Sequence, residues 1–100
     1  MIAEFKVVAV GSGESLSKYV AECVKIVDKS GLKYELTPMG TIIEGNLDEV
    51  IDIVKACHVR VREMTDRVVT SVEIDDRKGA SDEMRHKVES VERRLKPKKR

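Results

Sequence analysis

Four glutamates fall on one face of the strands that the sequence predicts. Along a strand, every second side chain points to the same side of the sheet. By that alternation one face carries four carboxylates and a single lysine among eight residues: Glu4, Lys6, Val8, Glu35, Thr37, Glu44, Ser71 and Glu73. Carboxylates in a shielded space repel one another, and a bound cation or partial protonation relieves the repulsion. The pattern favours a small cationic ligand over a phosphate; an ordinary solvated sheet face is the alternative.

Other kinds of chemistry have weaker signals. Gly11–Gly13 follows the first predicted strand, but the third glycine of a dinucleotide-binding loop would fall at Leu16, and no Gly-Lys-Ser/Thr motif is present. The two histidines, His58 and His86, and the two cysteines, Cys23 and Cys57, lack metal-ligand spacing. Both cysteines lie in apolar helical stripes. Nothing points to a Ser-His-acid or Cys-His arrangement. We therefore expect no metal, no cofactor and no catalytic residue.

The composition narrows the class of protein further. The 100 residues are 37% charged with a net charge of only +1, which argues against a general nucleic-acid binder, and 41% are hydrophobic, enough for a core. Only Phe5, Tyr19 and Tyr34 could stack on RNA bases. No apolar run approaches the roughly 20 residues of a membrane span, and Met1–Val10 lacks the apolar centre of a signal peptide. We expect a cytoplasmic protein with no nucleic-acid or membrane partner.

Two helices and four strands must position the acidic face. Ser15 is the expected N-cap of the first helix, and Gly31 its stop. Asn46 is the expected N-cap of the second helix, with Glu49 completing a capping box. Its apolar stripe is predicted as Leu47, Val50, Ile51, Val54, Cys57 and Val61. The strands are predicted over residues 2–10, 33–37, 41–45 and 67–76, with a tight turn at 38–40 that requires a hairpin.

The order of these elements defines the fold class. Strand, helix, strand, strand, helix, strand is the ferredoxin-like split β-α-β pattern of α+β proteins. We expect a four-stranded antiparallel sandwich with both helices on one face and with the first and last strands central. An extra C-terminal helix should complete a single domain over residues 1–95, followed by a basic tail at 96–100.

The C-terminal helix has a narrow apolar seam. Ser81 is its expected N-cap, and Met84, Val88, Val91 and Leu95 follow at spacings of four, three and four. A heptad-like stripe of this width suits a helix that packs on a neighbouring subunit. The alternative is a helix that folds back on its own domain.

Several segments together resemble one family, the small thiamine-binding proteins. The most specific are Tyr34–Thr41, with its Pro-Met-Gly-Thr sequence, and Ile74–Arg77, which reads Ile-Asp-Asp-Arg. Further matches occur in the same order along nearly the whole chain: Ile2–Glu4, Ser30–Lys33, Ile43–Gly45, Leu47–Glu49, Arg67–Ser71 and Lys87–Val91. One segment departs from the family, because Ala9–Glu14 replaces a proline- and threonine-containing loop found in many members.

The resemblance implies a ferredoxin-like fold, dimers that pair into tetramers, and binding of thiamine or its hydroxymethylpyrimidine part without turnover. Thiamine carries a fixed positive charge that suits an acidic pocket. The predicted site uses the carboxylates, directed hydrogen bonds and an apolar wall near the hairpin: Glu35, Thr37, Met39, Gly40, Thr41, Glu44 and Ser71. The ligand would be held by an oligomeric carrier or sensor. The alternatives are a structural or regulatory homo-oligomer with no thiamine ligand, and an unrecognised enzyme.

Overall fold

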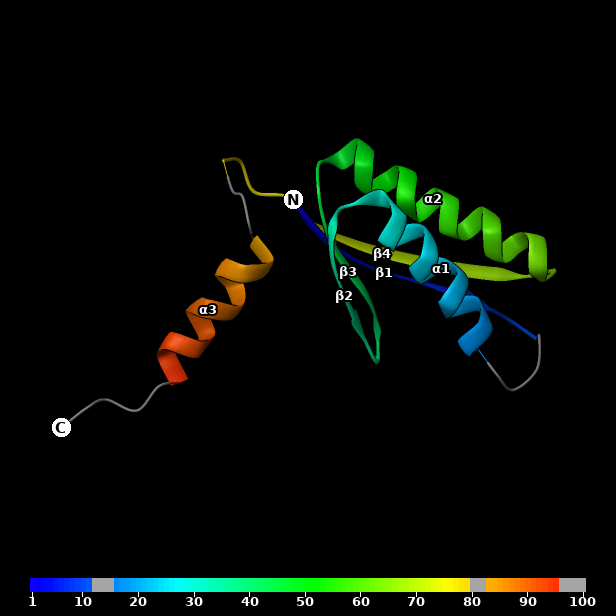
Figure 1. Cartoon of the computed structure of the whole chain (residues 1–100), viewed down its shortest axis with the longest axis horizontal. Coiled ribbons are helices and arrows are strands. Elements are labelled where there is room, and N and C mark those ends of the chain that lie inside the picture. The colour runs from blue at the N-terminus through cyan, green and yellow to red at the C-terminus, as the bar shows by residue number, and fades with distance from the viewer. Residues whose placement is uncertain (12–15, 80–82, 96–100) are drawn as a thin grey trace.

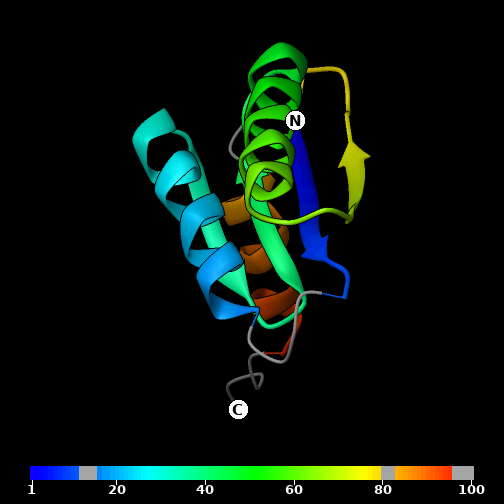
Figure 2. The ribbon, with the colours of Figure 1, turned by 90° about the vertical axis from the view of Figure 1, so that its right-hand side faces the viewer.

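The computed structural model describes residues 1–11, 16–79 and 83–95. Its elements follow the predicted order (Figure 1): β1 (Ile2–Ala9), α1 (Ser17–Ser30), β2 (Lys33–Thr37), β3 (Gly40–Glu44), α2 (Leu47–Met64), β4 (Val68–Asp75) and α3 (Glu83–Leu95). Figure 2 shows α1 and α2 on the same side of the sheet, as predicted. The chain is therefore a ferredoxin-like α+β fold with an added C-terminal helix. None of the helices it describes is long and apolar enough to cross a membrane.

The strand order corrects one prediction. The sheet runs β2-β3-β1-β4 with every neighbouring pair antiparallel, so the first and third strands are central and the last strand is an edge. The connection through α1 leaves a one-strand gap between β1 and β2, and β3 fills it as the hairpin partner of β2. The connection through α2 then carries the chain across to the free side of β1. Each crossover skips one strand, which places β4 outside.

The core lies between the sheet and the two packed helices. β1 contributes alternate residues, with Phe5 and Ala3 only 2% exposed, and β3 contributes the fully buried Ile43. α1 presents Tyr19, Cys23 and Val27. This arrangement is the one expected when every second residue of a half-covered strand is apolar.

The helix ends agree with the sequence in part. Asn46 accepts a hydrogen bond from the Glu49 amide at 2.8 Å, and the Glu49 carboxylate accepts one from the Asn46 amide at 2.9 Å, which completes the predicted capping box. Gly31 ends α1 in the left-handed region, at φ +77°. The predicted caps Ser15 and Ser81 lie outside the described residues. The N-cap position of α1 is Leu16, which makes no side-chain capping bond.

The apolar stripe of α2 is shifted from its prediction. Ile53 is buried, whereas Leu47 and Ile51 are about half exposed, at 51% and 42%. A helix covers a broad arc, and four predicted residues do face the core: Val50, Val54, Cys57 and Val61. The helix axis is rotated so that Ile53 and Val54 both face the sheet, and Ile51 turns toward solvent.

A charged cluster joins the outer surfaces of α1 and α2. Glu22 pairs with Lys25 at 2.8 Å and with Arg60 of α2 at 2.7 Å. Hydrogen bonds from Lys25 and Arg60 lower the pKa of the Glu22 carboxyl from 4.5 to about 2. A depressed carboxyl pKa contributes stability above the unfolded pKa, and that contribution disappears as pH falls through the folded pKa.

We expect Glu22 to titrate near pH 2 in a carbon-13 NMR experiment on the side-chain carboxyl groups. The Arg60→Gln variant should shift the midpoint upward, toward 4.5, because it removes one of the two cationic partners. The stabilising contribution of the cluster should be complete above pH 4.5 and be lost between pH 4.5 and 2. A wild-type midpoint near 4.5 would show that the cluster does not persist in solution.

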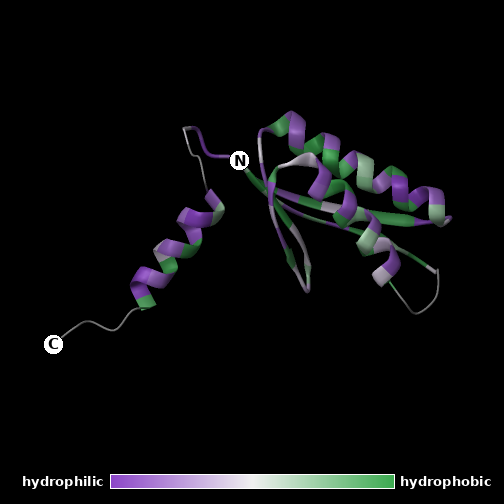
Figure 3. Cartoon of the chain, in the orientation of Figure 1, coloured by the Kyte–Doolittle hydropathy of each residue, from purple (hydrophilic) through white to green (hydrophobic). Residues whose placement is uncertain are grey.

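α3 stands apart from the body of the domain (Figure 1). Figure 3 shows it as mainly hydrophilic with separate hydrophobic positions. The seam residues Val88, Val91 and Leu95 are 55%, 56% and 75% exposed. The helix therefore does not fold back on its own domain, and three of its four seam residues are uncovered in the single chain, whereas Met84 is partly buried.

Candidate ligand-binding site

The uncovered face of the sheet has the residues that alternation predicts. Ladder register places Glu35 opposite Ile42, Ile42 opposite Glu4, and Glu4 opposite Glu73, so one row across all four strands contains three carboxylates. Residues paired directly across a ladder point to the same side of the sheet. Glu4 and Glu73 are immediate neighbours in this row, and like charges in that position repel.

A shallow hollow of about 300 Å³ lies over this acidic pair. Its polar side chains are Glu4, Glu73, Ser71 and Lys6, and Met39 of the hairpin turn forms an apolar wall. We call it the acidic hollow. Lys6 lies opposite Ser71 in the next row, so two carboxylates face one ammonium group within the hollow. A cationic guest would relieve the repulsion between Glu4 and Glu73.

A second space lies on the other side of the sheet, between the hairpin and α1. This hairpin cavity measures about 270 Å³, and Phe5, Tyr19, Cys23, Leu36 and Thr41 are among its lining residues. Its walls are mostly apolar, with a few hydroxyl groups. That composition suits a small neutral ring more than a charged one.

The hairpin turn separates the two spaces, and Thr37 holds it in shape. The Thr37 hydroxyl oxygen accepts hydrogen bonds from the amides of Met39, at 3.2 Å, and Gly40, at 3.1 Å, and its hydroxyl donates to the Gly40 carbonyl at 2.9 Å. The turn leaves Met39 71% exposed, where it lines both spaces. Thr37 therefore acts first as a turn residue.

Gly40 is required by the close approach of two strands. A Cβ atom at this position would lie 2.9 Å from the Phe5 carbonyl oxygen of β1. That contact is with backbone, which cannot swing away as a side chain can. Gly40 thus allows β3 to sit against β1 beside both spaces.

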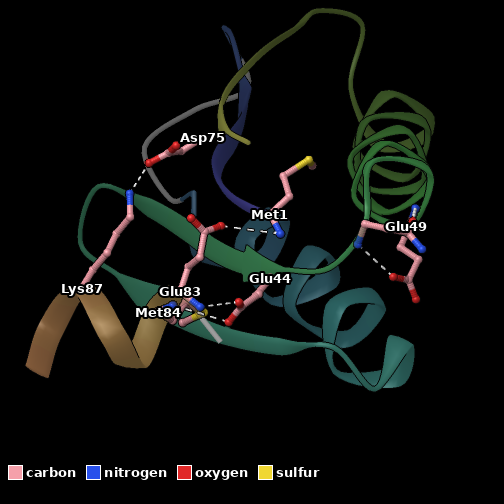
Figure 4. A network of polar contacts seen from close by, with 8 residues as sticks. Met1, Glu44, Glu49, Asp75, Glu83, Met84 and Lys87 are labelled. Carbon is pink, nitrogen blue, oxygen red and sulfur yellow. Dashed lines mark hydrogen bonds and ion pairs between the residues drawn. The ribbon is translucent and has the colours of Figure 1, made fainter. Parts of the chain in front are cut away.

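Glu44, predicted as a ligand carboxylate, contacts the C-terminal helix. It lies at the end of β3 farthest from the turn, and its carboxylate accepts hydrogen bonds from the amides of Glu83, at 2.5 Å, and Met84, at 3.4 Å. These are the first amides of α3, so Glu44, at the end of β3, caps the N-terminus of that helix. Figure 4 shows the contact together with the ion pairs of Glu83 with the Met1 amino group and of Lys87 with Asp75.

The structure thus divides the seven predicted site residues. Ser71 and Met39 meet in the acidic hollow, and Thr37, Met39, Gly40 and Thr41 line the hairpin cavity. Glu35 lies in the acidic row but is separated from Glu4 by Ile42. Thr41 is buried on the helix-covered face, opposite to the face that carries Glu35.

Both carboxylates of the acidic hollow are absent from the predicted site, as is Lys6. Glu4 and Glu73 had been placed on the correct face by alternation, but they are 69 positions apart in the sequence, and only the β1–β4 register makes them neighbours. Tyr19 and Cys23 of the hairpin cavity lie on the apolar stripe of α1. The signal for them was the helical stripe, which does not distinguish a core residue from one that borders a cavity.

The remaining candidate groups have structural partners. The Cys57 thiol donates to the Cys23 carbonyl at 3.7 Å, and its hydrogen bond with Cys23 and its burial raise the pKa of the Cys57 thiol well above its usual range. His58 Nδ1 lies 2.6 Å from the Thr70 hydroxyl. Within residues 1–11, 16–79 and 83–95, no three His, Cys, Asp or Glu side chains are grouped as metal ligands would be.

The fold and these two spaces define a ferredoxin-like domain with binding space on both sides of its hairpin. Comparison with known families identifies it more closely. The sequence profile of the thiamine-binding protein family matches residues 3–92, and the chain belongs to that family. The resemblance found in the sequence is thereby confirmed.

Individual relatives cover nearly all of the chain. It is 43% identical over 96 residues to a UPF0045 protein of Methanothermobacter thermautotrophicus, with 93% of this chain and 97% of the relative covered. It is also similar to protein MJ1052 of Methanocaldococcus jannaschii, whose crystal structure superposes with a TM-score of 0.86 at 37% identity, covering 91% and 94% of the two chains. The crystal structure of a candidate thiamine biosynthesis or salvage protein from Thermotoga maritima superposes with a TM-score of 0.80 at 26% identity, covering 90% and 96%.

Proposed function

We propose that this protein binds thiamine, or its hydroxymethylpyrimidine part, without turnover, as an oligomeric carrier or sensor. Membership of the thiamine-binding family supports the ligand class. The observation that carries the proposal is the pairing of Glu4 with Glu73 across the floor of the acidic hollow. Two neighbouring carboxylates with one nearby lysine attract a compact organic cation, and the thiazolium ring of thiamine is one.

The two spaces suit different parts of the ligand. In the acidic hollow Glu4 and Glu73 supply charge, Ser71 a hydroxyl group and Met39 an apolar wall. The hairpin cavity has apolar walls with the Thr41 and Tyr19 hydroxyl groups, which suit a neutral aminopyrimidine. We propose that thiamine binds in the acidic hollow and that the hairpin cavity accepts the neutral pyrimidine precursor.

The proposal includes assembly. An ion pair in open water contributes about 1 kcal/mol or less, whereas a shielded one contributes several times more. The acidic hollow is open in the single chain, so a second copy that covers the sheet face would strengthen the binding of a cation. The exposed seam of α3 gives such assembly a second contact, and we propose a tetramer built as a dimer of dimers. Cys23 and Cys57 are free and buried thiols, which suit a reducing cytoplasm.

The test is calorimetric titration of thiamine into the protein, and we expect the wild type to bind. The Glu4→Gln and Glu73→Gln variants should each bind thiamine at least tenfold more weakly, a loss of about 1.4 kcal/mol in binding free energy. Glutamine keeps the shape of glutamate and removes its charge. Glu35→Gln, which Ile42 separates from Glu4 in the row, should show a smaller loss. Glu89→Gln removes an exposed carboxylate on α3 and serves as the matched control.

Binding of hydroxymethylpyrimidine distinguishes the two spaces as binding sites, because this compound lacks the fixed positive charge of thiamine. Its affinity should be unchanged in Glu4→Gln and reduced by a substitution in the hairpin cavity such as Thr41→Val. Equal thiamine affinity in wild type, Glu4→Gln and Glu73→Gln would place the cation elsewhere. Failure of the wild type to bind either compound would favour the structural oligomer, and release of a product would favour the enzyme.

A further inference from the structure

A third hollow, of about 630 Å³, lies where the chain leaves β4 and meets α3. Arg77 and Lys78 line it from the segment after β4, and His86, Lys87 and Ser90 line it from α3. We call it the basic hollow. It lies beyond the C-terminal end of β4, where Asp75 pairs with Ile2, whereas the acidic hollow lies over the middle of β4, at Ser71–Glu73.

The charges around the basic hollow are not balanced. Three basic side chains, Arg77, Lys78 and Lys87, line it, and Glu83 is the acidic residue among its described lining residues. Glu83 is 5% exposed and faces the Met1 amino group, with its Oε2 atom 3.5 Å from that nitrogen. Two other nearby carboxylates also have partners, because Asp75 pairs with Lys87 and Glu44 accepts hydrogen bonds from the first amides of α3. These three carboxylates, Glu83, Asp75 and Glu44, therefore already have partners.

Arg77 and Lys78 are the cations of the basic hollow that make no close contact with a carboxylate, although the charge of Arg77 helps Lys87 to lower the pKa of the Asp75 carboxyl. In the part of the chain that the structure describes, neither side chain has a hydrogen-bond or ion-pair partner, although Asp76 precedes them in the sequence. Like charges held close to one another repel, and the chain as a whole is almost neutral. An excess of positive charge confined to one concave region is what an anion would neutralise.

The side chains match the shape of a phosphate group. A guanidinium group can donate two parallel hydrogen bonds to phosphate oxygens, and an ammonium group adds a compact charge. His86 and Ser90 are four positions apart on α3, so they lie on the same face of the helix and can add an N–H and an O–H donor. Gly79 has no side chain to obstruct the space.

We propose that the basic hollow binds a phosphate group carried by a small molecule, independently of the thiamine site. The proposal goes beyond the ligand binding inferred above and uses none of the same residues. The shared chemistry is a doubly charged phosphate, which can be free or part of a phosphate monoester. Arg77 supplies the bidentate contact, and Lys78 and Lys87 supply charge.

The test is titration of the full-length protein with inorganic phosphate and with glycerol 3-phosphate at low ionic strength. Binding is followed by calorimetry and by the ring signals of His86 in NMR spectra. We expect binding in the millimolar range or tighter, and a loss of at least tenfold in the Arg77→Gln/Lys78→Gln variant. The matched control Lys55→Gln/Arg67→Gln removes the same two charges far from the hollow and should bind as wild type does. Tighter binding of the ester than of free phosphate would identify the monoester as the source.

Three results would overturn the proposal. One is no shift of the His86 signals at millimolar phosphate. Another is an equal loss in both double variants, which would show attraction to overall charge only. The third is much tighter binding of a single-stranded oligonucleotide through the same residues, with a steep salt dependence, which would make the surface a nucleic-acid contact.

The His86→Ala/Ser90→Ala variant, which leaves the cations in place, should weaken phosphate binding severalfold. Thiamine affinity should be unchanged in all these variants.

Discussion

Gly40→Ala should destabilise the protein by about 1–3 kcal/mol, the usual cost of forcing an extra methyl group into a packed position. The added Cβ would lie 2.9 Å from the Phe5 carbonyl oxygen, so β3 and β1 would have to separate. For a domain of this size each kcal/mol lowers the thermal midpoint by roughly 4–8 °C. The measurement is thermal unfolding followed by circular dichroism. Both binding spaces border this strand pair, so the variant should also bind thiamine more weakly.

Gly45→Ala is a matched control for that experiment. A Cβ at position 45 would also lie 2.9 Å from its nearest neighbour, but that neighbour is the Cδ1 atom of Leu32, the far end of a flexible side chain. Leu32 can rotate away at small cost, and the strands keep their spacing. We expect a clearly smaller drop in midpoint than for Gly40→Ala. Equal effects would mean that the Gly40 contact is relieved without moving β1.

Val88→Asp/Val91→Asp should convert the proposed tetramer into smaller species. Both valines are more than half exposed in the single chain, at 55% and 56%, so aspartate there costs little before assembly. In an interface each unpaired charge would be desolvated, at a cost of about 3–5 kcal/mol when no partner is present. Sedimentation velocity of the wild type and the variant at equal concentration reports the change directly.

The matched control for the seam is Arg93→Gln/Arg94→Gln. It lowers the net charge by the same two units and leaves the four apolar seam residues intact. This variant should sediment as wild type does. If Val88→Asp/Val91→Asp also keeps the wild-type assembly and stability, α3 lies outside the interface, and contacts through the sheet face or the β4 edge would have to hold the oligomer together.

Local patterns were sufficient for the elements and for the side of the sheet on which each strand residue lies. The two-residue connection at Pro38–Met39 allows only a hairpin, and period-two alternation put Glu4, Glu35 and Glu73 on the uncovered face. The Asn46 capping box followed from two residues three positions apart. Each of these predictions depends on atoms that are close in sequence.

The errors arose where distant segments meet. The order of strands depends on how each helical crossover spans the sheet, and the linear pattern leaves this open, so β4 was expected in the centre and is an edge. The stripe of α2 depends on the rotation of the helix against the sheet, which exchanged Ile51 for Ile53. The ligand role of Glu44 stays a prediction, and the position of α3 adds a contact with two backbone amides that the local pattern did not predict.

Periodicity, capping and turn chemistry act over a few residues, so the linear pattern was enough to predict the fold class, the family and the acidic character of the open sheet face. Tertiary structure alone decided which carboxylates become neighbours. Glu4 and Glu73 face each other because β1 and β4 pair in one register. It also decided that Arg77 and Lys78 meet α3 across a hollow. Interaction energies between charges depend on distance through space, and that distance is set by packing between segments far apart in the chain.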